Sequence, residues 1–244
     1  MTNSLSTEFW QMAHDCAQSV RQHLYQHTHP SYGILLVHAL WQARLCGYDR
    51  IAVVEFGVAS GRGITALRQY ISEFSPQFGV TVDLIGFDSG QGLPPARDYR
   101  DHPEIWQQGE YASHYADPSV IFGDVSVTLP QLINSWPDTK LAFVSLDLDL
   151  YSSTVSALQI FQMPPERYLP TVLVHLDDAH THLTMNPWCG AELAIREFNN
   201  THQQRKIEQK HRCWNLDNFY AMHVLDHPFR NGIQPPMSIN CSPI

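Results

Sequence analysis

The sequence predicts an α/β fold, a doubly wound and mostly parallel sheet of about seven strands preceded by an N-terminal helical extension. Short apolar runs alternate with helical stretches from residue 50 onward, which is typical of strand–helix–strand units. Several runs end in aspartate, and open parallel sheets bind ligands at the carboxyl ends of their strands. A chain of 244 residues with 43% hydrophobic residues is sufficient to bury one such sheet between two helical layers.

The individual elements follow from the spacing of apolar residues. Helical spacing predicts helices in the N-terminal extension at Phe9–Tyr25 and Gly33–Cys46. The expected strands are Ile51–Gly57, Thr81–Asp88, Val120–Asp124, Leu141–Asp147 and Thr171–Asp177, followed by a strand pair at Lys206–His211 and Phe219–Leu225. The helices expected between them are Gly63–Phe74, Ser126–Ser135, Ser153–Phe161 and Gly190–Asn199.

These elements divide the chain into three parts. Residues 1–48 form a helical cover, residues 49–226 form the α/β domain, and residues 227–244, which carry four prolines, form an irregular tail. Within the α/β domain, the stretch from Gly90 to Pro118 has no periodicity and is rich in proline and tyrosine. Long loops in compact domains are usually functional, so we expect this stretch to cover a bound acceptor.

The composition favours a small-molecule partner. A formal net charge of −9, without a run of lysine or arginine, disfavours a nucleic-acid groove or an anionic membrane surface. Neither a secretion signal nor an apolar stretch near the ~18 residues of a membrane span is apparent. The five cysteines are widely spaced and include no CxxC pair, so we expect reduced thiols in a cytoplasmic protein.

The turn after the first strand has the chemistry of a cofactor site. Its glycines permit a tight turn whose backbone N–H groups approach an anionic or zwitterionic ligand, next to a helix N-terminus. The E-x-G-x-x-x-G-x-G spacing differs from the dinucleotide pattern, and an acidic residue would repel a pyrophosphate, which makes an NAD-dependent oxidoreductase the least favoured enzyme class. An ordinary strand–helix turn that needs glycine for packing is the alternative. The expected cofactor contacts here are Glu55, Gly57, Val58, Ala59, Ser60, Gly61 and Gly63.

The next two strands end in further candidate cofactor contacts. Asp88, followed by Ser89, ends the second strand, where folds of this type place a carboxylate that accepts hydrogen bonds from ribose hydroxyls. The Gly123-Asp124-Val125 segment ends the third strand and is a candidate contact for an adenine edge. The alternative for both aspartates is that they cap a turn or a helix.

Aspartates after the fourth and fifth strands predict a metal site. Asp147, Asp177 and Asp178 are expected to meet beside the cofactor, with Asp149 in reserve, and such crowding needs a cation or a proton to neutralise it. Carboxylate oxygens suit Mg²⁺, Ca²⁺ or Mn²⁺. The alternative is that Asp149 and Asp178 cap helices while Asp147 contacts the cofactor alone. His180 lies two residues after Asp178 and is the candidate general base, with Asp147 as the other catalytic residue.

Four segments together resemble the macrocin O-methyltransferase family and its uncharacterised bacterial relatives. These belong to the class I S-adenosylmethionine-dependent methyltransferases, whose fold is Rossmann-like. The segments are Glu55-Phe56-Gly57-Val58, Gly86-Phe87-Asp88-Ser89 with Gly92-Leu93-Pro94, Asp147 to Thr154, and Asp177-Asp178. The resemblance implies that Glu55 and Gly57 lie along the methionine part of S-adenosylmethionine, that Asp88 meets its ribose, and that Asp147, Asp177 and Asp178 bind a divalent metal.

The resemblance implies O-methylation of a hydroxyl on a small molecule such as a sugar or natural product, assisted by a divalent cation such as Mg²⁺. The chain departs from the family at Gly90-Gln91, where an aromatic and an acidic residue are usual, and at Ala179-His180, where an aromatic often follows the Asp pair. Both departures concern the acceptor pocket. A metal-independent methyltransferase and a cofactor-binding protein without turnover remain as alternatives, and a homodimer is expected from the class.

Overall fold

The computed structural model describes residues 29–113, 115–178, 184–210 and 218–230, together with residues 11, 15 and 18. The seven strands in this part of the chain are β1 (Arg50–Phe56), β2 (Thr81–Asp88), β3 (Val120–Phe122), β4 (Lys140–Leu146), β5 (Tyr168–Leu176), β6 (Arg205–Gln209) and β7 (Phe219–Val224). The α-helices are α2 (Pro30–Leu45), α3 (Arg62–Phe78), α4 (Val125–Asn134), α5 (Tyr151–Ala157) and α6 (Gly190–Thr201). Short 3₁₀ helices are η1 (Tyr99–Asp101), η2 (Leu158–Gln162), η3 (Pro165–Arg167) and η4 (Pro228–Arg230).

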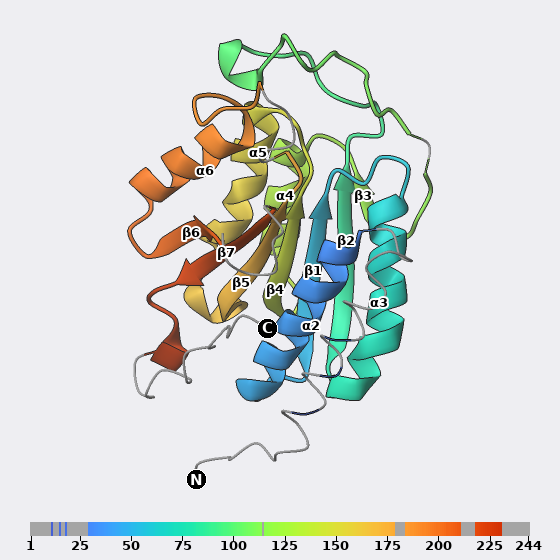
Figure 1. The fold of residues 1–244 in the computed structure, drawn as a ribbon, viewed down its shortest axis with the longest axis vertical. Coiled ribbons are helices and arrows are strands. Elements are labelled where there is room, and N and C mark those ends of the chain that lie inside the picture. The colour runs from blue at the N-terminus through green and yellow to red at the C-terminus, as the bar shows by residue number, and fades with distance from the viewer. Residues whose placement is uncertain are drawn as a thin grey trace.

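The strands form one sheet in the order β3-β2-β1-β4-β5-β7-β6 (Figure 1). Strands β1 to β5 are parallel, and β7 runs antiparallel between β5 and β6. The strand order reverses between β1 and β4, which is the position where open α/β sheets bind their ligands. The Rossmann-like fold expected from the alternating pattern is therefore confirmed.

Helices cover both faces of this sheet. On one face, α2 and α3 bury a core that includes Leu36, Leu67 and Phe143. On the other, α4, α5 and α6 bury a larger core that includes Leu129 and Phe198. Helix α2, from the N-terminal extension, packs against α3, β4 and β5, so it lies close to the centre of the sheet (Figure 1). Its N-terminal end is thereby placed near the point of strand reversal.

The observed elements differ from the expected ones mainly at their ends. Strand β3 ends at Phe122, because Asp124 caps α4 by accepting a hydrogen bond from the Ser126 amide. The helix expected to run to Phe161 ends at Ala157 and continues as the 3₁₀ helix η2. The expected helix at Phe9–Tyr25 and the tail after Arg230 lie outside the described residues, apart from three isolated positions.

Two further expectations concern the whole chain. The described helices include none that is long and apolar enough to cross a membrane. Of the five cysteines, the structure describes Cys46 and Cys189, and both are free thiols.

A large side chain at the centre of the sheet should carry a large share of the stability. Phe143 on β4 is fully buried, and its ring packs edge-on against the ring of Tyr32 with the ring centroids 5.8 Å apart. Replacing Phe143 by alanine is expected to lower the free energy of unfolding by about 3–5 kcal/mol, through lost burial and a residual cavity. Phe122→Ala is the control, because that ring is 46% exposed, and it should cost far less. Urea denaturation measures both, and equal losses would contradict this assignment of the core.

Candidate active site

The turns that follow β1 and β4 touch each other. The Asp147 amide donates to the Phe56 carbonyl at 3.0 Å, and the Gly57 amide donates to the Phe87 carbonyl at 2.9 Å. A side chain at position 57 would overlap the backbone carbonyl of Asp147, and Gly57 also has a φ of 84°. Glycine at this position therefore lets the glycine turn (residues 57–63) lie directly beside the first aspartate of the predicted metal site.

The Asp88 carboxylate shapes the glycine turn. One of its oxygens accepts from the amides of Val58 at 3.0 Å and Ala59 at 2.8 Å, and the other accepts from the Gly90 amide at 2.7 Å. Ser89, next in the chain, donates through its hydroxyl to the Gly92 carbonyl. Asp88 ends β2 as the sequence predicted, and the structure shows that its carboxylate caps backbone amides, while contact with a ribose stays a prediction. The oxygen that accepts a single bond keeps a lone pair for a ligand hydroxyl.

The N-terminus of α3 offers an anion-binding position. Gly61 is the N-cap residue with a φ of 81°, and no side chain caps this end in the described part of the chain. The first amides of a helix have no intrahelical acceptor, and the helix dipole adds positive potential there. A ligand carboxylate fits this end of the turn, and ligand hydroxyls fit the Asp88 end. The residues present therefore suit S-adenosylmethionine, which carries both groups.

Glu55 lies beneath the turn and is closed off from solvent. It is 2% exposed, and its Oε1 accepts a hydrogen bond from the Tyr32 hydroxyl at 3.1 Å. Its Oε2 is buried without a hydrogen-bond partner among the described residues. A side chain at Gly63 would overlap Oε1, so glycine there makes room for the carboxyl. Burial raises the pKa of Glu55 to about 8, so at neutral pH this group is mostly a neutral carboxylic acid.

A buried polar chain extends from Glu55 under the strand reversal. The Tyr32 hydroxyl contacts Ser145 Oγ at 2.7 Å, and Ser145 Oγ lies 3.4 Å from Nδ1 of His175. Burial lowers the pKa of His175 to about 3, which keeps this imidazole neutral. His29, just before α2, stacks on Tyr32 with ring centroids 5.1 Å apart. No sequence pattern pointed to His29 or Tyr32, because only the packing of α2 on β4 and β5 brings them here.

The structure brings the three predicted metal ligands together. One carboxylate oxygen from each of Asp147, Asp177 and Asp178 lies within 4.8 Å of the others. Asp178 also accepts a hydrogen bond from the Asp149 amide at 2.8 Å, and Asp149 is buried with a φ of 58°. Three hard oxygen donors at this spacing suit a divalent cation such as Mg²⁺.

Burial and mutual repulsion disfavour the charged forms of these carboxyls. Both causes raise the pKa of Asp147 well above its usual range, with Asp177 as the first repelling neighbour. Burial and Asp178 raise the pKa of Asp149 to about 9, and burial raises the pKa of Asp177. A bound cation or retained protons would relieve this repulsion. His180, the predicted base, lies outside the described residues.

The third predicted cofactor segment stands apart from this cluster. Gly123, Asp124 and Val125 lie at the end of β3, on the far side of β2 from the acidic group. Asp124 Oδ1 accepts from the Ser126 amide at 2.8 Å, and the Ser126 hydrogen bonds lower the pKa of Asp124. Asp124 therefore acts as a helix cap, and contact with an adenine edge remains a prediction.

A long segment, which we call the strap (residues 89–119, described except for residue 114), crosses the carboxyl end of the sheet (Figure 1). Its two arms pair where the Leu93 amide donates to the Glu110 carbonyl at 2.8 Å and the Gly109 amide donates to the Leu93 carbonyl at 2.9 Å. Burial and the charges of Asp149 and Glu110 raise the pKa of Tyr111. The strap therefore lies at the edge of the sheet where open α/β folds bind their ligands.

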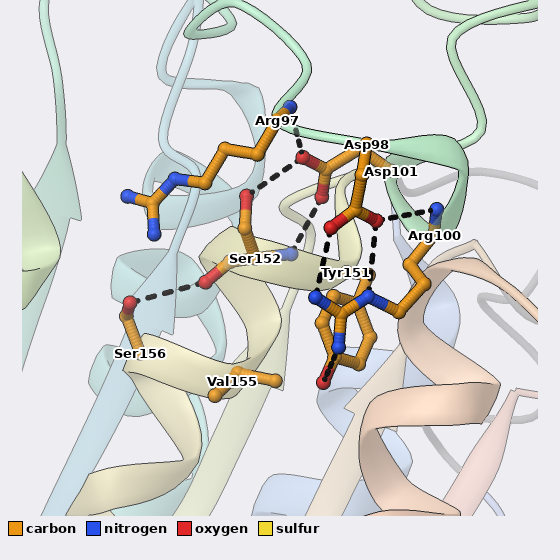
Figure 2. A pocket seen from close by; sticks show the side chains of 8 residues that line it. All are labelled: Arg97, Asp98, Arg100, Asp101, Tyr151, Ser152, Val155 and Ser156. Carbon is orange, nitrogen blue, oxygen red and sulfur yellow. Dashed lines mark hydrogen bonds and ion pairs between the residues drawn. The ribbon is translucent and has the colours of Figure 1, made fainter.

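A pocket of about 250 Å³ marks the place where the strap joins α5 (Figure 2). The Asp101 carboxylate accepts from the Ser152 amide at 2.7 Å and the Arg97 amide at 2.7 Å. Arg100 is paired with Asp98, and its guanidinium also lies over the ring of Tyr151. The hydrogen bonds of Asp101 to Ser152 and of Arg100 to the Tyr151 hydroxyl fasten the strap to the helix. We therefore interpret the pocket as an anchor of the strap.

The buried Glu55 carboxyl predicts a pH dependence of stability. Its pKa rises from 4.5 in an exposed glutamate to about 8 in the fold, so the folded chain holds a proton that the unfolded chain loses. Stability from this group is complete below pH 4.5 and is lost as the pH rises toward 8. Glu55→Gln should remove this loss, on the order of a few kcal/mol, and should melt above the wild type near pH 8.

Glu73→Gln on the exposed face of α3 is the matched control and should leave the pH profile unchanged. Thermal melts across this pH range make the comparison. Parallel profiles for the wild type and Glu55→Gln would show that Glu55 is already ionised in the fold.

No protein-family model matches the chain, and no curated protein matches it in sequence. Among solved structures, it is similar to CalS11, a calicheamicin methyltransferase, with 20% identity and a TM-score of 0.55 over 89% of this chain and 93% of that one. The apo form of CalS11, described as TDP-rhamnose 3'-O-methyltransferase, matches with 19% identity and a TM-score of 0.48 over 89% and 95% of the two chains. At this identity the first likeness establishes the fold alone. The chain thus has the Rossmann-like α/β fold that is found in the methyltransferase CalS11.

Proposed function

We propose that this protein is an S-adenosylmethionine-dependent methyltransferase that transfers a methyl group to a hydroxyl of a small molecule. The observation that carries the proposal is the contact of Gly57 with Asp147, which joins the glycine turn to the acidic group at the point of strand reversal. A cofactor site and an acceptor site on either side of this contact would share one cleft. The charge of −9 favours a small-molecule acceptor over a nucleic acid.

Two likenesses support this proposal. The likeness to CalS11 covers nearly all of both chains, and CalS11 is a methyltransferase. Four segments resemble the macrocin O-methyltransferase family, and residues from each of them, Gly57, Asp88, Asp147 and Asp177, lie at the carboxyl ends of neighbouring strands, which favours membership in that family. We infer a sugar or another hydroxylated natural product as the acceptor class from the same resemblance.

In such a transfer, S-adenosylmethionine supplies a methyl group on a positively charged sulfur, and the products are a methyl ether, S-adenosylhomocysteine and a proton. The protein contributes mainly by holding the acceptor oxygen in line with the methyl carbon, so that the carbon–oxygen bond forms as the carbon–sulfur bond breaks. The amides at the N-terminus of α3 would hold the carboxylate end of the cofactor, and Asp88 would orient its ribose. The hydroxyl proton passes to His180 or to a carboxylate of the acidic group.

Asp147, Asp177 and Asp178 would hold a divalent cation in this scheme. A cation there would supply Lewis-acid chemistry, lowering the pKa of an acceptor hydroxyl and offsetting the negative charge on its oxygen. The cluster fits this role because its carboxyls are close together and poorly solvated.

A metal-independent methyltransferase is the second candidate. Burial and the neighbouring Asp178 raise the pKa of Asp149 to about 9, which supports neutralisation of part of the acidic group by protons without a cation. In that case a neutral carboxylic acid would donate a hydrogen bond to the acceptor, and an ionised neighbouring carboxylate would receive the proton of the acceptor hydroxyl.

Cofactor binding can be tested without knowing the acceptor. Isothermal titration of the purified protein with S-adenosylhomocysteine should give micromolar affinity. Asp88→Asn should weaken this affinity by about tenfold or more, because Asp88 both shapes the turn and orients ribose. Asp83 lies on the same strand but pairs with Arg50 at the surface, so the Asp83→Asn variant should bind S-adenosylhomocysteine like the wild type. If the wild type shows no binding, the proposed activity is wrong.

The metal is tested by its effect on the melting temperature. Millimolar Mg²⁺ should raise the melting temperature of the wild type, because it binds the folded state alone. Asp147→Asn should lose this shift and, without Mg²⁺, should be at least as stable as the wild type, because one repelling carboxyl is gone. Asp138→Asn, an exposed position, should respond to Mg²⁺ like the wild type. Cofactor binding without any Mg²⁺ response would favour the metal-independent candidate.

A further inference from the structure

The end of the strap rests on the glycine turn. A side chain at Gly61 would overlap the ring of Tyr115, so the aromatic ring occupies the space that a larger residue at position 61 would need. The same ring packs against an apolar cluster that includes Val58 in the turn and Ile64 in α3. Tyr115 therefore packs against the glycine turn and the start of α3.

Polar contacts with α3 fix the position of this ring. The Tyr115 hydroxyl donates to Asp117 Oδ2 at 3.2 Å and lies 3.4 Å from the Thr65 hydroxyl. Asp117 forms an ion pair with Arg68, one helical turn after Thr65, and the Arg68 guanidinium also donates to the Ser119 hydroxyl at 2.7 Å. Two successive positions on one face of α3 therefore hold this end of the strap.

The strap is also held at a second place. Asp101, near its middle, accepts a hydrogen bond from the Ser152 amide of α5 at 2.7 Å. A segment held at these two places has little freedom to leave the turn. The conformation of the glycine turn is therefore set by contacts with the strap as well as by its hydrogen bonds to Asp88.

We propose that Tyr115 is a positioning residue of the cofactor site, whose ring holds the glycine turn in the shape that binds S-adenosylmethionine. This inference rests on the proposed function. A turn that is already ordered binds its ligand without the entropic cost of ordering, so loss of the ring lowers affinity even where the ring does not touch the ligand. The packing of the ring carries this effect, and the hydroxyl serves mainly to orient it.

The experiment is isothermal titration of the full chain with S-adenosylhomocysteine, using three variants. Tyr115→Ala removes the ring and should raise the dissociation constant about tenfold or more. Tyr115→Phe keeps the ring and should bind within about threefold of the wild type. Tyr99→Ala, on the same strap but 73% exposed, is the matched control and should bind like the wild type.

The stoichiometry of binding separates positioning from simple destabilisation. If Tyr115→Ala only unfolds part of the sample, the number of sites per chain falls while the dissociation constant of the remainder stays the same, and the inference is overturned. A positioning role requires a full complement of sites with weaker affinity, together with recovery in Tyr115→Phe. Equal dissociation constants for the wild type and Tyr115→Ala also overturn it. Absence of binding by the wild type would instead refute the proposed function.

Discussion

The absence of a side chain at position 57 is the constraint on which the site depends. Strands β1 and β4 are neighbours at the point where the strand order reverses, and their following turns meet with the Asp147 carbonyl against Gly57. Any larger residue would push the two turns apart and separate the glycine turn from the acidic group. The sheet supplies the direction of these two turns, while one glycine sets how closely they approach.

Poorly solvated carboxyls around this contact lower the stability of the fold. Glu55, Asp147 and Asp149 are carboxyls in poorly solvated positions, and the pKa of each is raised. Neutral carboxylic acids are tolerated in such places, whereas carboxylates need a cation nearby. The two groups differ in access: Glu55 is closed off beneath the turn, while the carboxylates after β4 and β5 converge at the end of the sheet. Glu55 therefore supports the turn from inside the fold, whereas the carboxylates after β4 and β5 are available to a ligand.

The sequence predicted the carboxylates at the strand ends, but it did not predict the side chains that other elements pack against them. Alternating apolar runs place Asp88, Asp147 and Asp177 correctly, because a strand that ends in a carboxylate must present it at the carboxyl edge of a parallel sheet. The pattern does not reveal that Glu55, one residue before that edge in its strand, turns toward α2. Nor does it reveal Tyr32, whose contact with Glu55 spans 23 positions and depends on how a helix packs across the sheet. The role of Asp124 was open between ligand contact and helix cap; the structure shows the cap, and ligand contact stays a prediction.

The two outer strands of the sheet limit how copies of this chain can associate. At one side β3 has only three residues, and at the other β6 carries Arg205, Lys206 and Glu208, with charged partners along its length. A brief strand offers few unpaired backbone groups, and a charged one resists a second strand laid against it. Both edges of the described sheet are therefore poor templates for a further strand.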